Sequence, residues 1–153
     1  ANKMDVEICE LEERDRASLR DILRVSFDTL RTLDTLELDC YIEHGQMPPS
    51  RWYVARVKGY VVGCVNVTIR SSEEGYINSL SVVEGFRGRG IGTMLVQKAI
   101  QYLRDHGCKS VFLYVRPKNT VAKVFYEKLG FVNFGLTKNA NLEDVFLFRK
   151  DLF

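Results

Sequence analysis

The chain has 153 residues, enough for one domain with a full hydrophobic core. An apolar share of 46%, a charged share of 27% and a net charge of +2 are ordinary for a soluble globular protein and indicate neither a nucleic-acid nor a membrane partner. No apolar run approaches the roughly 20 residues of a membrane span, and the polar N-terminus lacks a signal-peptide pattern, so a cytoplasmic location is expected.

The four cysteines are scattered singly, and no pair of them has the spacing of metal ligands. With only two histidines besides, we expect no metal site. Reduced thiols in a cytoplasmic protein are the default interpretation.

The N-terminal third predicts one strand followed by two helices. Residues 6–11 alternate weakly, as in a strand, and residues 13–31 carry leucine, isoleucine and phenylalanine at helical spacing. Residues 34–44 predict a second, shorter helix, and the stretch 45–50, with two consecutive prolines, predicts a loop.

Three strands are expected next. Residues 52–57 and 60–69 flank Lys58-Gly59, a plausible hairpin turn, and a second turn leads into a strand at 76–82. Together they predict an antiparallel meander.

The pattern then changes to four-residue periodicity. A helix is expected from Ile91 to a glycine cap at Gly107, followed by a buried strand at 111–115. A short helix over 119–129 and strands at 131–136 and 145–152 complete the chain. This order predicts an α+β fold, with a mixed, mostly antiparallel sheet of about seven strands flanked by helices, in a single domain over residues 1–153.

The glycine-rich run Arg87-Gly88-Arg89-Gly90-Ile91-Gly92 lies between the third meander strand and the long helix. N–H groups at a helix start lack carbonyl partners, and the helix dipole adds positive charge there. Glycine allows a phosphate to approach the backbone closely, and the arginines add charge. The run therefore predicts a phosphate-binding loop.

Other glycine-rich loops fit less well. A Walker loop requires Gly-Lys followed by Ser or Thr, and none is present. A dinucleotide fingerprint has its glycines spaced G-x-G-x-x-G, whereas here they are spaced G-x-G-x-G. A simple hairpin turn is disfavoured because helical periodicity begins inside the run.

Two motifs resemble the GNAT superfamily of N-acetyltransferases. Arg87, Gly90 and Gly92 match its pyrophosphate loop, and the segment from Asn119 to Phe131, with Phe125-Tyr126 and Leu129-Gly130-Phe131, looks like its second hallmark. The similarity runs from about residue 52 to the C-terminus. It implies a sheet with splayed central strands and acetyl-CoA as acyl donor.

The resemblance also implies which residues hold coenzyme A: Leu80, Ser81, Val82, Arg87, Gly88, Arg89, Gly90, Ile91, Gly92, Thr93, Asn119 and Tyr126. Leu80 and Val82 would act through the main chain of a bulged strand, because their side chains are expected in the core. Arg89 could equally be a surface residue, and Asn119 could cap its helix, contact the cofactor, or do both.

Tyr126 is implied as the general acid that protonates the departing thiolate, with a simply packed tyrosine as the alternative. Some family members use an acidic base on the strand before the loop, but this chain has Asn78 and Ser79 there. The candidates for the base are Tyr76, which has that role in some family members, then Tyr114, and Glu73 or Glu74 through water. A tyrosine, with a pKa near ~10, would need a lowered pKa or a water relay.

We therefore predict direct transfer of an acetyl group from acetyl-CoA to a primary amine of a small molecule, such as a polyamine or amino compound. The alternatives are a protein or peptide N-terminus or lysine as acceptor, and a non-catalytic acyl-CoA-binding module. Acidic residues within 33–50 and 137–144 could attract a cationic amine or could form solvated faces. A homodimer is left open.

Overall fold

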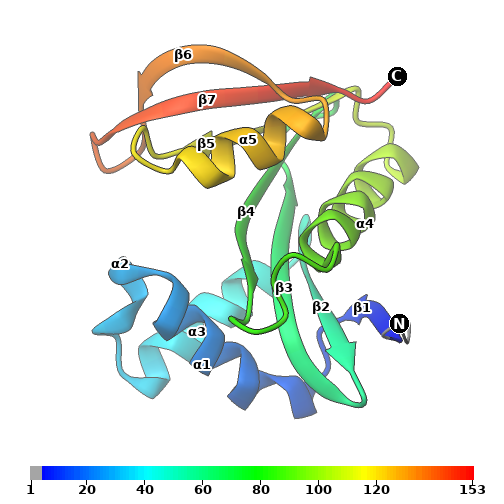
Figure 1. Cartoon of the computed structure of the whole chain (residues 1–153), viewed down its shortest axis with the longest axis vertical. Coiled ribbons are helices and arrows are strands. Elements are labelled where there is room, and N and C mark those ends of the chain that lie inside the picture. Colours follow the sequence, from blue (N-terminus) through cyan, green and yellow to red (C-terminus); the bar gives the residue numbers. More distant parts are fainter. Residues whose placement is uncertain (1–4) are drawn as a thin grey trace.

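The computed structural model describes residues 5–153 and places all of its strands in one seven-stranded sheet (Figure 1). The first four residues of the predicted domain lie outside the described residues. The elements are β1 (Val6–Glu10), a 3₁₀ turn η1 (Glu13–Asp15), α1 (Arg16–Ser26), α2 (Asp28–Arg31), α3 (Thr35–Gln46), β2 (Ser50–Val57), β3 (Tyr60–Ile69), β4 (Glu74–Val82), α4 (Ile91–Asp105), β5 (Ser110–Val115), α5 (Thr120–Lys128), β6 (Val132–Lys138) and β7 (Asp144–Asp151).

The sheet has the strand order β1-β2-β3-β4-β5-β7-β6, and every adjacent pair is antiparallel except β4 and β5. The predicted meander is present as β2–β3–β4. Lys58 and Gly59 both have positive φ, 51° and 82°, as the tight hairpin turn between β2 and β3 requires. The expected mixed, mostly antiparallel α+β architecture is confirmed.

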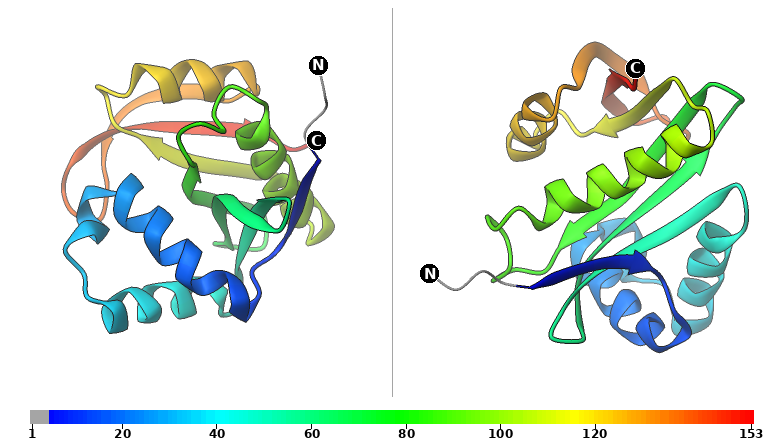
Figure 2. Two further views of the ribbon diagram at one scale, coloured as in Figure 1. Left: turned by 60° about the horizontal axis from the view of Figure 1, so that its bottom comes forward. Right: turned by 90° about the vertical axis from the view of Figure 1, so that its right-hand side faces the viewer.

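Helices cover both faces of the sheet and enclose two separate cores. α1 and α3 lie on one face, and α4 lies on the other (Figure 2). Side chains of β2 alternate between them, so that Trp52 and Val54 pack under α1 and α3 while Tyr53 and Ala55 belong to the core of α4 and α5. The Trp52 indole Nε1 donates a hydrogen bond to the Ile42 carbonyl at 3.0 Å, which fixes α3 on the sheet.

The middle of the sheet is open because β4 and β5 pair only at their starts. The parallel ladder joins Glu74 to Ser110, Gly75 to Val111 and Tyr76 to Phe112. β4 runs on to Val82 while β5 and its partners turn away (Figure 1). The gap at the carboxyl ends of parallel strands is where α/β sheets commonly hold ligands.

The helix predicted over 13–31 is broken into η1, α1 and α2. Phe27 adopts an extended conformation, with φ −128° and ψ 114°, and separates α1 from α2. Leu30 on α2 is buried in the same core as Leu19 and Leu23 on α1. The break turns the chain so that these leucines share one core, and helical periodicity could not reveal this change of direction.

A buried ion cluster ties the start of the first helical segment to the sheet. Arg56 of β2 donates from Nε and Nη2 to the Asp15 carboxylate at 3.1 and 2.5 Å, and both residues are almost fully buried. Glu12 accepts a further bond from Arg56 at 2.7 Å, and its main-chain N–H donates to Asp15. Burial alone would raise the pKa of Asp15, but the Arg56 and Glu12 hydrogen bonds more than offset it and lower the pKa.

Replacing Arg56 with methionine is expected to lower the free energy of unfolding by about 3–5 kcal/mol, because it leaves the Asp15 carboxylate buried without its partner. A carboxyl with a lowered folded pKa stabilises the fold above its unfolded pKa of about 4, and this stability is lost as the pH falls through the folded value. The penalty should therefore shrink in acid. Urea unfolding at pH 7 and pH 3.5 measures both effects.

Arg14→Met is the matched control, because Arg14 pairs with Glu12 in solvent and its loss should cost under about 1 kcal/mol. Equal losses in the two variants would contradict a stabilising role for the buried pair.

Candidate active site

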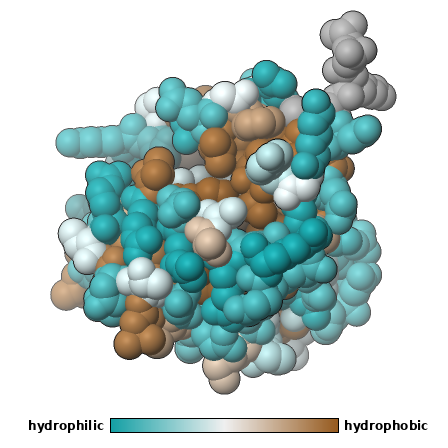
Figure 3. Space-filling view, turned by 90° about the horizontal axis from the view of Figure 1, so that it is seen from below, coloured by the Kyte–Doolittle hydropathy of each residue, from teal (hydrophilic) through white to brown (hydrophobic). Residues whose placement is uncertain are grey.

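The separation of β4 from β5 opens a cleft of about 1020 Å³. Five segments line it: the end of α1 with the start of α2, β4, the loop from Phe86 into α4, the end of β5, and α5. Seen from below, hydrophobic surface is visible in a hollow bordered by hydrophilic side chains (Figure 3). An apolar floor with polar edges suits an elongated ligand that has an apolar arm and a charged end.

A β-bulge at Ser79 shapes the cleft wall formed by β4. Cys64 pairs with Ser81 and Asn66 with Asn78, so β4 has one residue more than β3 between these pairs. Ser79 has a positive φ of 54°, and its hydroxyl hydrogen-bonds to the Tyr41 hydroxyl at 2.8 Å. At the bulge, Ser79 and Leu80 have no partner in the β3 ladder, and β5 no longer pairs with β4 there.

The residues after the bulge occupy the places that the sequence indicated. Leu80 and Val82 are partly buried against the core of α4 and α5, so any ligand contact there would be through the main chain. The Ser81 hydroxyl hydrogen-bonds to that of Ser26 at 2.5 Å and joins β4 to the end of α1. All three β4 residues line the cleft.

The glycine-rich loop ends at the N-terminus of α4, as predicted. Gly88 and Gly90 have positive φ of 74° and 82°, and Gly90 is the N-cap. The helical hydrogen bonds begin with Met94 N–H to the Gly90 carbonyl, which leaves the N–H groups of residues 91–93 without partners inside the helix. A Cβ on Gly92 would lie 3.3 Å from the Phe125 ring. The loop therefore presents main-chain donors and positive dipole to the cleft.

The two loop arginines differ in placement. Arg87 lines the cleft, and its Nε donates to the Val82 carbonyl at 2.9 Å. Arg89 is not among the lining residues, and its guanidinium lies over the Phe86 ring at 5.8 Å. Ile91 is buried, so only its main chain faces the ligand side, whereas Gly92 and Thr93 line the cleft.

Asn119 caps α5 on the opposite wall. Its Oδ1 accepts a hydrogen bond from the Ala122 N–H at 3.0 Å, as expected for an N-cap. The residue also lines the cleft. The structure therefore allows the capping and ligand-contact interpretations together.

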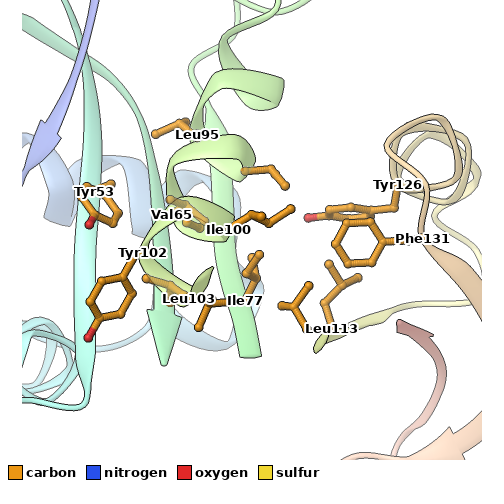
Figure 4. Close-up of a cluster of buried hydrophobic side chains, with 14 of the residues drawn as sticks. Tyr53, Val65, Ile77, Leu95, Ile100, Tyr102, Leu103, Leu113, Tyr126 and Phe131 are labelled. Carbon is orange, nitrogen blue, oxygen red and sulfur yellow. The ribbon is translucent and has the colours of Figure 1, made fainter. Parts of the chain in front are cut away.

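Tyr126 lies in the last turn of α5 and lines the cleft. Its ring packs edge-on against Phe125 and Phe131 at centroid distances of 5.0 and 5.4 Å. Figure 4 shows its hydroxyl oxygen directed away from Phe131 toward the side of α4 and β4. Burial, and to a lesser extent nearby Tyr76, raises the pKa of Tyr126, so the phenol keeps its proton. A protonated hydroxyl in the cleft is a hydrogen-bond and proton donor.

Tyr76 is held in an aromatic group on β4 and β5. Its ring stacks on Phe112 at 4.9 Å and lies 5.9 Å from the Tyr114 ring, and the Arg70 guanidinium is 4.6 Å from its centroid. Burial raises the pKa of Tyr76, although Asn78 and Arg70 act in the opposite direction. The lowered pKa that a base would need is therefore absent, and only a water relay remains open to Tyr76.

The other candidate bases are placed less favourably. The Glu73 carboxylate pairs with Lys109 at 3.3 Å, and that of Glu74 lies 3.6 Å from Arg149. Neither glutamate lines the cleft, whereas Tyr114 does.

The acidic residues of the segment 33–50 do not face the cleft. Arg20 of α1 binds Asp39 at 2.6 Å, and Arg16 pairs with Glu43. These carboxylates join α3 to α1 and are neutralised there. In the segment 137–144, Glu143 and Asp144 likewise pair with Arg116 and Lys138. Of the two interpretations of these segments, attraction of a cationic amine therefore has no support, and the solvated, paired face is favoured.

The sequence missed part of the site. Ser26, Phe27, Asp28 and Thr29 line the cleft at the junction of α1 and α2. These residues reach the cleft because the helix breaks at Phe27. A single helix predicted over residues 13–31 does not include that break.

Within residues 5–153, no group of three histidine, cysteine, aspartate or glutamate side chains could hold a metal ion. No helix in this part of the chain is long and apolar enough to cross a membrane.

Comparisons of sequence and structure with known proteins cover most of the chain. A sequence model described as "Acetyltransferase (GNAT) family" matches residues 16–131. An N-alpha-acetyltransferase of Sulfurisphaera tokodaii is 30% identical over 121 residues, covering 70% of this chain and 72% of that protein. The crystal structure of Ard1 from Thermoplasma volcanium has a TM-score of 0.81 and 27% identity, covering 97% of this chain and 98% of that one.

A more distant structure shares the fold. An aminoglycoside 6'-N-acetyltransferase complexed with coenzyme A has a TM-score of 0.79 at 20% identity, covering 96% of this chain and 97% of that one. Alignments to three further curated relatives cover only 38, 48 and 46% of those proteins' lengths, so the chain spans less than half of each.

Proposed function

Because this chain belongs to the acetyltransferase (GNAT) family, we propose that it transfers an acetyl group from acetyl-CoA to a primary amine. The observation that carries the proposal is the cleft between β4 and β5, with a helix N-terminus at its loop end and the Tyr126 hydroxyl in its wall. We treat residues 1–153 as one acetyltransferase domain, which the single sheet running from β1 to β7 supports.

The loop residues 87–93 would hold the diphosphate of coenzyme A. Main-chain N–H groups at the start of α4 supply donors, the helix dipole supplies positive potential, and Arg87 adds a full charge. The main-chain groups of Leu80 to Val82 that face the cleft would hydrogen-bond the amides of the pantetheine arm, apart from the Val82 carbonyl, which already accepts a bond from Arg87, and Asn119 lies on the facing wall. Coenzyme A in the structure of the aminoglycoside acetyltransferase, which has this fold, supports the choice of donor.

In the reaction the amine nitrogen attacks the thioester carbonyl, and the carbon–sulfur bond then breaks. Tyr126 would donate its proton to the departing sulfur, so that coenzyme A leaves as a thiol. The attacking nitrogen loses one proton as the amide forms, and a proton returned to the Tyr126 oxygen restores the phenol for the next turnover. Direct transfer is supported because no cysteine lines the cleft among the residues described, and burial raises the pKa of the Cys64 thiol to about 12.

Two acceptor classes remain, a small-molecule amine and the N-terminus or a lysine of a peptide. Similarity to the N-alpha-acetyltransferase of Sulfurisphaera tokodaii favours an α-amine such as a peptide N-terminus. A non-catalytic acyl-CoA-binding module is disfavoured, because such a module has no need of a phenol donor inside the cleft.

The test is release of coenzyme A thiol from acetyl-CoA in the presence of polyamines, amino-acid amides, aminoglycosides and short peptides. We expect release above the acceptor-free rate with at least one of these amines, together with an acetylated product by mass spectrometry. Tight coenzyme A binding with no thiol release for any acceptor would contradict the proposed activity and favour the binding module.

A further inference from the structure

The reaction requires an amine with a free lone pair, and most amines carry a proton at neutral pH. An acetyltransferase can meet this requirement by supplying a base, or by accepting an amine that is already partly neutral. The composition of the cleft wall distinguishes these two solutions.

Among residues 5–153, the cleft wall has no imidazole and a single carboxylate, that of Asp28. In this part of the chain, the titratable side chains on the wall are Asp28, Tyr76, Arg87, Tyr114, Arg116 and Tyr126. The guanidinium groups are permanently protonated. The wall therefore contains one carboxylate, and three phenols that could take a proton only as phenolates.

The one carboxylate lies at the rim. Asp28 begins α2, its side chain is 83% exposed, and its Oδ1 pairs with Arg31 at 3.2 Å. An exposed, paired carboxylate is held in water rather than against a buried reacting centre.

Burial keeps two of the three phenols, Tyr76 and Tyr126, protonated. Tyr76 is packed between Phe112, Tyr114 and the Arg70 guanidinium, with Asn78 two residues away on β4 and Tyr41 of α3 within electrostatic range. Burial raises the pKa of both Tyr76 and Tyr126. Neither phenol can hold an amine proton at neutral pH, although each can orient an amine by a hydrogen bond.

We propose that the cleft selects its acceptor by basicity, acetylating weakly basic primary amines of the α-amine type in preference to lysine side chains and polyamines. This inference rests on the proposed acetyltransfer and names its substrate class. About a quarter of an α-amine is neutral near pH 7.4, against roughly 0.1% of a lysine amine. The stronger nucleophilicity of the more basic amine offsets part of this advantage, so we expect a preference of at least about tenfold.

The experiment uses two small acceptors that share a 3-methylbutyl group, leucinamide and 3-methylbutylamine, which lacks the carboxamide, and their pKa values differ by roughly 2–3 units. kcat/KM is measured by thiol release from about pH 6.5 to 9.5. We expect leucinamide to be preferred at pH 7.4 and its profile to level off near pH 8, while that of 3-methylbutylamine keeps rising tenfold per pH unit. Two profiles that level off at the same pH would reveal an enzyme base and overturn the inference.

Two peptides test whether the α-amine acceptor is a peptide N-terminus or a small molecule. One peptide has a free N-terminus and no lysine, and the other has the same sequence with a blocked N-terminus and one internal lysine. Preference for the first is expected, and its kcat/KM relative to leucinamide tells a peptide acceptor from a small one. Equal or better use of the lysine peptide would overturn the inference.

Asp28→Asn removes the carboxylate at the rim. The pH at which the kcat/KM profile for leucinamide levels off should be the same in this variant as in the wild type. A shift of that pH, or a profile that no longer levels off, would identify Asp28 as the base and overturn the inference. Thiol release with none of the acceptors would overturn the proposed acetyltransfer itself, whereas release with a shared levelling pH would overturn only the selection by basicity.

Discussion

Replacing Tyr126 with phenylalanine is expected to lower kcat about 100-fold or more and to leave coenzyme A affinity within about twofold. General acid catalysis by a positioned side chain contributes about 10²–10⁴ in rate. The phenol is held in the cleft by its ring contacts with Phe125 and Phe131, which phenylalanine retains. The loss should therefore fall on the chemical step rather than on binding or folding.

The measurement is steady-state thiol release with calorimetry for coenzyme A on the same preparation. Tyr102→Phe is the matched control, because Tyr102 is a buried tyrosine of α4 that does not line the cleft. Unchanged kcat in Tyr126→Phe would remove this hydroxyl from the mechanism. An equal fall in the Tyr102 variant would attribute the loss to repacking of the core.

Replacing Gly90 with tryptophan is expected to weaken coenzyme A binding at least about 100-fold. Several charge-assisted hydrogen bonds to a diphosphate contribute more than the 2.8 kcal/mol or so that this factor represents. Gly90 is the N-cap of α4 and lines the cleft, so an indole at this position would occupy the space in front of the helix N-terminus. Calorimetric titration with coenzyme A measures the loss.

Gly59→Trp is a close control for backbone strain. Gly59 and Gly90 have the same φ of 82°, and a Cβ on either would meet no atom within 4 Å. Gly59 lies in the β2–β3 turn and is not part of the cleft wall. The two variants should lose similar stability, but only Gly90→Trp should lose cofactor affinity. Retained affinity in Gly90→Trp would exclude the loop as the diphosphate site.

The element order and the sheet type were predictable because each depends on periodicity within a segment. The positive φ at Gly88 and Gly90 and the N-cap at Asn119 were also predictable, since turn and cap chemistry is local. The break at Phe27 was not predictable from the sequence, because it depends on the core in which the Leu30 side chain is buried. A helical pattern carries no information about the direction in which the next turn must go.

The roles of charged residues were the least predictable part of the site. The acidic stretch on α3 read as a surface that could attract an amine, but Arg16 and Arg20 on α1 neutralise it. Those arginines are separated from their partners by 27 and 19 residues, and nothing in the local sequence pairs them.

The glycine-rich loop at a helix start and the capped helix that carries Tyr126 follow from the sequence, because glycine conformation, capping and helical spacing act over a few residues. The tertiary fold was needed to show that β4 and β5 part after Tyr76, that burial keeps Tyr76 protonated, and that Asp28 supplies the only carboxylate on the described cleft wall. Strand pairing, desolvation and charge neutralisation arise between segments far apart in the chain, and these contacts set the chemistry that the cleft can offer an amine.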